Sequence, residues 1–494
     1  MTKTYLKYRS RVIITSGLIV FCWVGLSVRL FQIQIIDGEE LRLKGHNQSM
    51  IQKPLKAVRG NIFDRDNAAF TRNIIHYSFG VHPALIDNKE EFAEWISTSI
   101  DGNKDKYLKK LNSSRSFEYL ERNLQRKHCE KLLINKPQGL IVERDSRRYY
   151  PHGNLASQVL GFVDLDDKGI AGIEQKFNSY LAGKPGWIVR QMSGRGYSMY
   201  KTNLPQKTPV DGASIQLTID LDYQAILQEE LAAQLELTNA ISAMGLILNP
   251  QTGDILAMAT VPDFDPNYPG RGEISWQRNK VITDQFEPGS TFKIVPLTAA
   301  VDQNTVSLWQ EFNCENGSYT YAGHKIRDWD DFGLLTMPQI MENSSNVGVI
   351  KIAETLSQNN LYHYSRDLGF GMHTHISLAG EHPGTLHQVS EWSKISLAEV
   401  SLGHEVAVTA LQLGMAYAAI ANGGFLMKPR LLKQIITSSG KKVYAEKPEV
   451  IRKVTTKEVM DIMKGMLCRV VETGTGTKAA INGWSVAGKT GTAQ

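Results

Sequence analysis

One stretch decides the fold of this chain: Phe286-Glu287-Pro288-Gly289-Ser290-Thr291-Phe292-Lys293. Its Pro-Gly turn leads into a mostly apolar run, residues 294–301, that is typical of a buried helix. Ser290 and Lys293 are three residues apart, so in the first turn of that helix they share one face, with Cβ atoms roughly 5–6 Å apart. A lysine amine that loses its hydration there has a lowered pKa and can accept the proton of a serine hydroxyl. The sequence therefore predicts Ser290 as a nucleophile and Lys293 as its base.

The Ser-x-x-Lys pattern is weak by itself, because an ordinary helix start with a surface lysine has the same spacing. It recurs at Ser198, Ser438 and Ser439, which lie in polar, turn-like surroundings, whereas Ser290 opens an apolar helix.

Two further motifs strengthen the prediction. Ser344-Ser345-Asn346 lies between a helical stretch, 337–342, and an apolar run, 347–352, and Lys489-Thr490-Gly491 follows near the end of the sequence. Ser-x-Asn is also weak alone, since it recurs at Ser357. In this order, however, the three motifs form the constellation of penicillin-recognising serine acyltransferases.

Length and composition restrict the alternatives. A chain of 494 residues is too long for one core and predicts two or three domains. The net charge of +5, without a long Lys/Arg block, argues against a nucleic-acid partner. Neither Cys-x-x-Cys nor a His, Asp and Glu cluster with metal-ligand spacing occurs, so we expect no disulfide framework and no metal site. Four separated cysteines are expected to be mostly buried thiols: Cys22, Cys129, Cys314 and Cys468.

The N-terminus has the pattern of a membrane anchor. Residues 1–11 carry four basic side chains and no acid, and 12–28 are almost wholly apolar before Arg29 and a further apolar run to residue 36. Spanning hydrocarbon takes about 20 residues, so we expect Arg29 to snorkel and the helix to run on. A cleaved signal peptide is the competing interpretation, but no small-x-small site follows the apolar core. The prediction is a cytoplasmic tail, 1–11, and a transmembrane anchor, 12–34, with the rest outside.

Residues 35–205 are polar and mixed and predict a scaffold domain. A strand is expected at 74–81 and an amphipathic, charged helix at 117–133. Two charged patches, 59–65 and 147–151 leading to 169–174, are interpreted as salt-bridged loops and not as a second active site. Residues 201–213 have the Pro, Gly and Thr content of a linker.

Residues 206–494 predict an α+β domain, an antiparallel sheet beside a helical cluster. A strand is expected at 214–220, a helix at 223–237 and a hairpin at 244–249 and 254–261. A further helix is expected to start after Thr409 as N-cap and to end before Gly423.

The whole chain resembles a class B penicillin-binding protein, a peptidoglycan D,D-transpeptidase, and most of all the cell-division type. The resemblance rests on the anchor, on Arg59-Gly60 with Asp64-Arg65, on Arg148-Tyr149 with Gly172-Ile173-Glu174, and on the three motifs. It implies an elongated pedestal over 35–205 and a penicillin-binding transpeptidase domain over 206–494. Glu287-Pro288-Gly289-Ser290 is nearer the division type than the elongation type.

The resemblance also implies roles for the motif residues. Ser290 attacks the penultimate D-alanine of a stem peptide, Lys293 takes its proton, and Ser344 helps to pass that proton to the leaving amine. Asn346 holds the substrate amide. Lys489 sets the local field, and Thr490 and Thr492 beside Gly491 bind the terminal carboxylate. The N–H groups of Ser290 and Thr492 form an oxyanion hole, typically worth about 3–4 kcal/mol per donor.

The implied ligands are D-Ala-D-Ala stem peptides and β-lactams. The implied partners are a SEDS-type glycosyltransferase and other divisome membrane proteins, in the inner (cytoplasmic) membrane. The protein crosses that membrane once, with the N-terminus in the cytoplasm and the catalytic domain in the periplasm or its extracytoplasmic equivalent. Nucleic acid, metal and cofactors play no part.

Three positions depart from the family pattern. Asn67 replaces a glycine that usually follows Asp64-Arg65, which puts that turn in doubt. Pro296 lies one turn into the catalytic helix, where its ring is expected to kink the helix. The sequence stops three residues after Gly491, whereas the family continues with strands that flank the Lys-Thr-Gly segment. We therefore expect a C-terminally truncated sequence whose last segment lacks ladder hydrogen bonds and which reacts slowly with penicillin.

Other functions fit less well. Gly483 to Thr490 matches a phosphate-binding loop, but such a loop must follow a strand and open a helix, and 474–482 is glycine-rich and polar. An inactive scaffold would have lost a catalytic residue, and a sensor needs an output domain. A β-lactamase or D,D-carboxypeptidase would not be expected to carry this pedestal. The alternatives kept are an elongation-type transpeptidase and a non-catalytic penicillin-binding scaffold or sensor.

Overall fold

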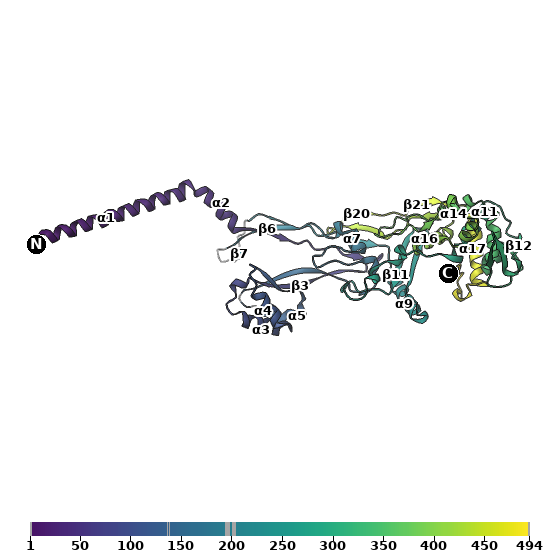
Figure 1. Cartoon of the computed structure of the whole chain (residues 1–494), viewed down its shortest axis with the longest axis horizontal. Helices are drawn as coiled ribbons and strands as arrows, with labels where there is room; N and C mark the ends of the chain where they lie inside the picture. Colours follow the sequence, from purple (N-terminus) through teal and green to yellow (C-terminus); the bar gives the residue numbers. More distant parts are fainter. Residues whose placement is uncertain (1, 136, 138, 193–197, 200–203, 493–494) are drawn as a thin grey trace. The chain divides into compact units, whose positions relative to one another are not determined.

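A computed structural model describes residues 2–135, 137, 139–192, 198–199 and 204–492 (Figure 1). They fall into two compact units. The first consists of Met1–Ala57 with Gly183–Asp211, and the second of Val58–Ala182 with Gly212–Gln494.

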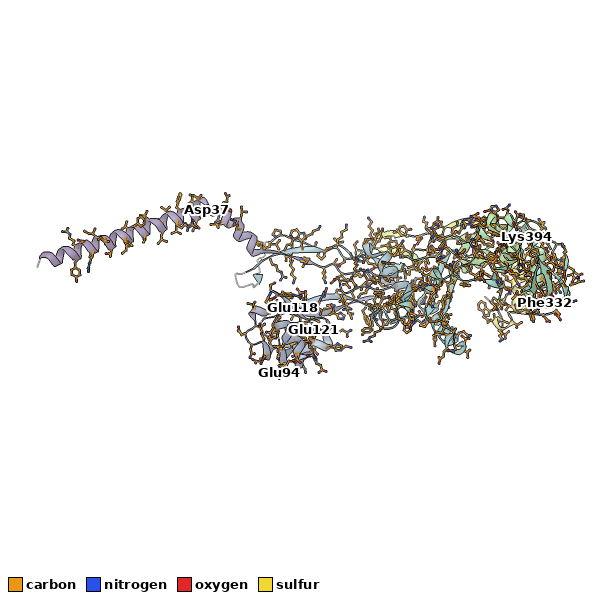
Figure 2. All side chains as sticks on the ribbon, in the orientation of Figure 1. Asp37, Glu94, Glu118, Glu121, Phe332 and Lys394 are labelled. Atoms are coloured by element: carbon orange, nitrogen blue, oxygen red, sulfur yellow. The ribbon has the colours of Figure 1, made fainter. Side chains whose placement is uncertain are left out.

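The first unit contains the candidate anchor. Among the described residues, Tyr8–Ile36 is the one helix that is long and apolar enough to cross a membrane. Its large apolar side chains are exposed, as a helix surrounded by lipid requires. Asp37 follows it (Figure 2), and its N–H donates to Gln32 O at 2.8 Å. The elements of this unit are α1 (Thr2–Phe31), η1 (Gln32–Ile36), α2 (Gly38–Ser49), β1 (Met50–Leu55), β6 (Gly186–Met192), β7 (Ser198–Met199) and β8 (Gln206–Lys207).

Strand β8 lies within the segment whose composition predicts a linker. It pairs with β6 in antiparallel fashion, so part of 201–213 is ordered as an edge strand. Residues 200–203 lie outside the described part of the chain. The division into 1–11, 12–34, 35–205 and 206–494 stays a prediction.

A three-stranded antiparallel sheet with its own core forms one part of the second unit. Its order is β4 (Glu118–Gln125), β3 (Arg72–Val81), β5 (Leu140–Tyr149), and three helices pack on it: α3 (Lys89–Ile100), α4 (Lys104–Leu111) and α5 (Arg126–Ile134). The strand expected at 74–81 is confirmed. The helix expected at 117–133 is wrong over its first half, which is β4 and carries Glu118 and Glu121 (Figure 2).

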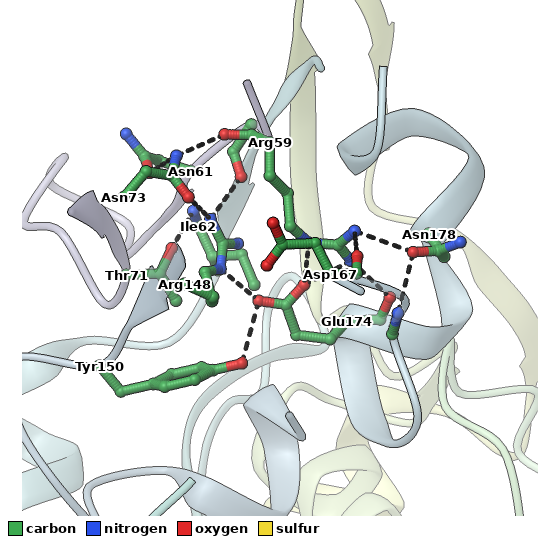
Figure 3. Close-up of polar contacts among 12 residues, drawn as sticks. Arg59, Asn61, Ile62, Thr71, Asn73, Arg148, Tyr150, Asp167, Glu174 and Asn178 are labelled. Carbon is green, nitrogen blue, oxygen red and sulfur yellow. Dashed lines mark hydrogen bonds and ion pairs between the residues drawn. The ribbon is translucent and has the colours of Figure 1, made fainter. Parts of the chain in front are cut away.

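The two charged patches of the pedestal meet in one buried ion cluster (Figure 3). Glu174 Oε2 accepts from Arg59 Nε at 2.8 Å, and its Oε1 accepts from Arg148 Nε at 2.5 Å and from Tyr150 at 3.3 Å. All three charged side chains are almost completely buried. The interpretation of these patches as structural ion pairs is confirmed.

The turn at Asn67 keeps the backbone that a glycine would give. Its φ is +71°, in the left-handed region that asparagine tolerates better than most residues. Asp64 Oδ1 accepts the N–H groups of Asp66 and Ala68 at 2.8 and 2.7 Å and closes the turn. The departure from glycine therefore leaves this turn intact.

The rest of the second unit is an α+β arrangement, as expected. The hairpin is confirmed as β10 (Ala243–Asn249) with β11 (Asp254–Val261), and α9 (Leu221–Thr238) packs on both strands. A second sheet has the order β2 (Ile62–Phe63), β9 (Ser214–Leu217), β19 (Leu432–Ile436), β20 (Lys442–Ala445). The helix after Thr409 is α16 (Ala410–Ala421), with a capping box between Thr409 and Gln412.

Helices around α11 (Ile294–Asp302) form the main core, and α11 is buried from Ile294 to Val301. The other elements of this unit are η2 (Pro83–Leu85), α6 (Ser157–Leu160), α7 (Gly172–Lys176), α8 (Asn178–Leu181), η3 (Ile274–Gln277), α10 (Lys280–Thr283), η4 (Gly289–Lys293), β12 (Glu311–Asn313), η5 (Glu315–Gly317), β13 (Ser318–Tyr321), β14 (His324–Arg327), β15 (Leu334–Thr336), α12 (Met337–Asn343), α13 (Asn346–Ala353), α14 (Gln358–Asp367), β16 (Thr385–Leu386), η6 (Val389–Glu391), α15 (Ser396–Leu402), β17 (Val406–Ala407), β18 (Phe425–Met427), β21 (Val450–Lys453), α17 (Lys457–Glu472) and η7 (Thr477–Ala479).

Pro296 does not break the catalytic helix in the way expected. The segment Gly289–Lys293 is a 3₁₀ turn, and the α-helix begins only at Ile294. Pro296 therefore lies in the first α-helical turn, where its missing N–H has no partner to lose. The expected kink is replaced by a change from 3₁₀ to α geometry.

The segment around Lys489 lacks the surroundings of a phosphate loop. The element before Gly483 is a short 3₁₀ turn, η7, and not a strand. Residues 485–492 pair with no strand, and their backbone is tied to α17 by Gly488 N–H, which donates to Leu467 O at 3.2 Å. The strand that a phosphate loop must follow is therefore not found directly before this segment.

Candidate active site

The segment before Ser290 is held by backbone contacts. Gly289 has φ +53°, and its N–H donates to Gly403 O at 3.2 Å. A Cβ on Gly289 would collide with the backbone of Thr492, so only glycine fits this approach. Thr291 O accepts from the Tyr417 hydroxyl at 2.9 Å. The 3₁₀ turn that carries Ser290 is therefore fixed from two sides.

Lys293 is fully buried, and its amine faces the second motif. Nζ donates to Ser344 O at 2.7 Å and to Asn346 Oδ1 at 2.7 Å, and it lies 3.3 Å from Ser344 Oγ. Burial lowers the pKa of Lys293 well below its ordinary value, the charge of Lys489 lowers it further, and Asp328 opposes them. The lowered pKa increases the fraction of Lys293 that is neutral at ordinary pH, and only the neutral amine can act as a general base.

The Ser344-Ser345-Asn346 motif is a tight turn between two helices. Ser344 ends α12 with φ +56°, and Ser345 caps α13 by accepting the Gly348 N–H at 2.9 Å. The turn points Ser344 O and Asn346 Oδ1 at the same amine. The turn thus brings two of the predicted site residues, Ser344 and Asn346, to Lys293.

Asp328, at the end of β14, organises this turn and was missed from the sequence. Its carboxylate accepts the Ser345 hydroxyl at 2.7 Å, the Val347 N–H at 3.1 Å and the Asn346 N–H. The Asn346 side chain also donates to Arg327 O at 2.9 Å. An aspartate 17 residues before Ser345 carries no local signal, because a hairpin brings it there.

The Lys489-Thr490-Gly491 segment lies against the nucleophile turn. A Cβ on Gly491 would come within 2.7 Å of the Thr291 methyl, and Thr490 Oγ1 bonds with Thr475 Oγ1 at 2.9 Å. Lys489 Nζ donates to Thr490 O at 2.8 Å. Burial lowers the pKa of Lys489 to about 8. This lysine therefore changes charge near neutral pH.

One cavity of about 480 Å³ collects most of the predicted residues. It is lined by Ser290, Trp329, Ser344, Asn346, Leu402, His404, Thr475, Thr490, Gly491 and Thr492. Lys293 and Lys489 are not part of this lining, although Lys293 bonds to Ser344 and Asn346, which are. Trp329 and Thr475 were not predicted. A larger cavity of about 720 Å³ lies between 366–375 and 426–452 and contains none of the predicted site residues.

The nucleophile and its base are not yet in contact. Ser290 Oγ makes no hydrogen bond to Lys293 Nζ within the described part of the chain, so proton transfer requires the two atoms to approach, which is common before substrate binds.

No cluster of three or more His, Cys, Asp or Glu suited to a metal occurs among the described residues. Of the four cysteines, Cys129 and Cys314 are buried, whereas Cys22 is exposed and Cys468 half-buried.

Comparisons with known families cover both halves of the chain. Residues 243–494 match the family described as the penicillin binding protein transpeptidase domain. Residues 54–217 match the penicillin-binding protein dimerisation domain.

Known proteins match over nearly the whole chain. The stage V sporulation protein D of Bacillus subtilis is 30% identical over 485 residues, which is 97% of this chain and 75% of that protein. The probable peptidoglycan D,D-transpeptidase PenA of Neisseria meningitidis is 30% identical, over 96% of this chain and 81% of that protein. The peptidoglycan D,D-transpeptidase FtsI of Escherichia coli is 29% identical, over 98% and 81%.

A solved structure of a penicillin-binding protein has a similar fold. Penicillin binding protein 3 of Mycobacterium tuberculosis, complexed with aztreonam, superposes with a TM-score of 0.68 at 26% identity, covering 90% of this chain and 83% of that one. From its apolar N-terminal helix to the turn beside Thr492, this chain belongs to the class B penicillin-binding proteins.

Proposed function

We propose that this protein is a serine-type D-Ala-D-Ala transpeptidase that cross-links peptidoglycan stem peptides through an acyl-enzyme on Ser290. The observation that carries the proposal is the buried amine of Lys293. A neutral amine has two N–H groups and one lone pair. The two 2.7 Å bonds to Ser344 O and Asn346 Oδ1 occupy both N–H groups, which leaves the lone pair for a serine proton.

Acylation follows from this arrangement. Lys293 takes the proton as Ser290 Oγ attacks the penultimate D-alanine carbonyl, and the bond to the terminal D-alanine breaks. Ser344, whose Oγ lies 3.3 Å from Lys293 Nζ, relays the proton to the departing amine. An amine of a second stem peptide then takes the acyl group and restores the Ser290 hydroxyl.

The remaining motif residues bind and polarise the donor peptide. Asn346 holds the substrate amide, Lys489 supplies positive charge near the terminal carboxylate, and Thr490 and Thr492 beside Gly491 donate to that carboxylate. The backbone N–H groups of Ser290 and Thr492 form the oxyanion hole, where a fixed donor is typically worth about 3–4 kcal/mol. Their positions around one cavity support these roles.

The cellular role that we propose is cell-wall synthesis at the division septum, with β-lactams as inhibitors. The support is the likeness to FtsI and PenA and to a relative solved with aztreonam. The protein would work in the inner membrane beside a SEDS-type glycosyltransferase and other divisome proteins. The apolar helix Tyr8–Ile36 and the basic residues before it support one span with the N-terminus in the cytoplasm.

The test is acylation by a fluorescent penicillin followed by mass spectrometry of the digest. We expect one adduct, on Ser290. An adduct on Ser198, Ser344 or Ser438 would reject the assignment, and absence of any adduct would favour the non-catalytic scaffold.

The elongation-type transpeptidase is the alternative within the same family. A fluorescent fusion of the protein concentrated at midcell supports the septal role. The same fusion spread along the sidewall would replace it with elongation.

A further inference from the structure

His404 lies at the edge of the candidate active site, on the loop that follows α15. Its N–H donates to Glu399 O at 2.9 Å, and the preceding Gly403 has φ +84° and bonds to Gly289. This anchors the histidine backbone next to the nucleophile turn. Its side chain is 28% exposed and lines the same cavity as Ser290.

His404 differs from every other residue of that lining in its chemistry. The lining consists of hydroxyl, amide, indole, apolar and glycine groups, with His404 as the one titratable side chain among the described residues. An imidazole changes charge between about pH 5 and 8 and in its neutral form has one nitrogen lone pair that accepts a proton. A base is therefore exposed to the cavity in addition to the buried Lys293.

Glu287 lies beside this imidazole, within ion-pair distance but beyond hydrogen-bond distance. Glu287 Oε2 lies 3.7 Å from His404 Nδ1, and Glu287 Oε1 accepts the Glu405 N–H at 3.3 Å. A carboxylate on the Nδ1 side favours the tautomer with the proton on Nδ1 and leaves the lone pair on Nε2. The carboxylate also stabilises the imidazolium once it forms.

The reaction needs such a group after acylation. In the first half-reaction Lys293 handles the proton of Ser290. In the second half-reaction a primary amine attacks the acyl carbonyl, and the amine nitrogen must lose a proton as its bond to carbon forms. A cavity-facing base can take that proton directly, whereas Lys293 lies behind Ser344 and Asn346 and donates to both.

We propose that His404, positioned by Glu287, is the general base for the primary amine that accepts the acyl group. This rests on the proposed function. The new C–N bond forms, one amine proton moves to His404 Nε2, the bond between the carbonyl carbon and Ser290 Oγ breaks, and the imidazolium returns the proton to Ser290 Oγ. The products are an amide and the free serine, so atoms and charge balance.

The two half-reactions use different bases under this proposal. Acylation uses Lys293, which is buried and bonded to Ser344 O and Asn346 Oδ1, and acyl transfer uses the imidazole lone pair of His404. A change at His404 should therefore act on the second half-reaction alone.

The experiment separates the two half-reactions of the protein. Acylation is measured with a fluorescent penicillin, and acyl transfer is measured with an acyl-D-alanyl thioester donor and D-alanine as the amine acceptor. His404→Gln should slow aminolysis about 100-fold, within the 10²–10⁴ range of general base catalysis. Acylation should fall less than threefold. Glu287→Gln should give a smaller loss of aminolysis and leave acylation within the same threefold limit.

A matched control is His387→Gln. His387 Nδ1 lies 3.8 Å from Glu391 Oε2, the same type of pair, but His387 does not line this cavity. Both half-reactions should be unchanged in that variant. Equal loss of acylation and aminolysis in His404→Gln, or no loss of either, overturns the inference. A native protein that no penicillin acylates overturns the proposed function instead.

Discussion

At the scale of single residues, the proposed reaction depends on the charge of two lysines, Lys293, which is fully buried, and Lys489, which is half-buried. Burial lowers the pKa of Lys293 well below the ordinary lysine value, with a further lowering by Lys489. Lys293→Arg keeps the charge and much of the length but cannot give up a proton. Acylation by penicillin should fall by about 10²–10⁴, the usual contribution of a general base. Stopped-flow labelling measures it, and a wild-type rate would remove Lys293 from this role.

The same two lysines predict a bell-shaped pH profile for acylation by a donor peptide. Because the pKa of Lys293 is lowered, its neutral form persists at lower pH than an exposed lysine allows, and the rate falls when pH drops through that lowered pKa. The pKa of Lys489 is lowered to about 8, so its positive charge is lost above pH 8 and carboxylate binding weakens. The measurement is kcat/KM from pH 5 to 10. A fall in kcat/KM centred near pH 10.5 instead of near pH 8 would contradict the assignment of the alkaline limb to Lys489.

Asp328 offers a residue-scale test of the turn that carries Ser344 and Asn346. Asp328→Asn keeps the volume but loses the charge that accepts three donors, so acylation should slow by roughly tenfold, equivalent to about 1.4 kcal/mol, the lower end of the range for bonds to charged groups. Asp331→Asn, on the exposed loop nearby, should react like the native protein. Unchanged acylation of Asp328→Asn would show that the turn holds its shape alone.

At the scale of elements, periodicity predicted most of the transpeptidase region and failed where pairing is non-local. The hairpin at β10 and β11 and the capped helix α16 carry turn and cap residues next to their apolar runs, so local signals suffice. Strand β4 consists of residues such as Glu, Leu, Arg and Gln that favour helices, and its pairing with β3 overrides them.

The same contrast between local and non-local signals applies to the residues of the candidate active site. Ser290, Lys293, Ser344 and Asn346 could be predicted because each motif combines a local turn with a distinctive chemistry. Asp328 and His404 could not, since their positions depend on the β13–β14 hairpin and on the contact of Gly403 with Gly289. Neither contact leaves a pattern in the sequence.

The ion cluster around Glu174 links segments that are distant in the chain, and its stability can be measured. Glu174→Gln leaves Arg59 and Arg148 buried without a countercharge, and losing one partner of a buried pair typically costs about 3–5 kcal/mol. Denaturant unfolding should show that loss. Asp166→Asn removes an exposed partner of Arg122 and should leave the transition in place. Equal stability of all three proteins would mean that the cluster contributes nothing net.

At the scale of the whole molecule, the charge around the apolar helix predicts its orientation. The basic residues before Val12 favour the cytoplasmic side. A periplasm-only reporter fused after Glu40 should be active, and the same reporter fused before Arg11 should be silent. The reverse pattern would place the cavity around Ser290 in the cytoplasm, where it has no cell-wall substrate.

The contact between Gly289 and Gly403 leaves little room for substitution next to Ser290. A Cβ on either glycine would strike backbone, of Thr492 or of Gly289, and both have positive φ. Under the proposed function, a substitution there would damage the reaction with inhibitor and natural donor alike, because both would react at Ser290. Side chains of the cavity lining, such as Trp329 and Thr475, are then the positions where affinity for a rigid bicyclic drug can change without that loss.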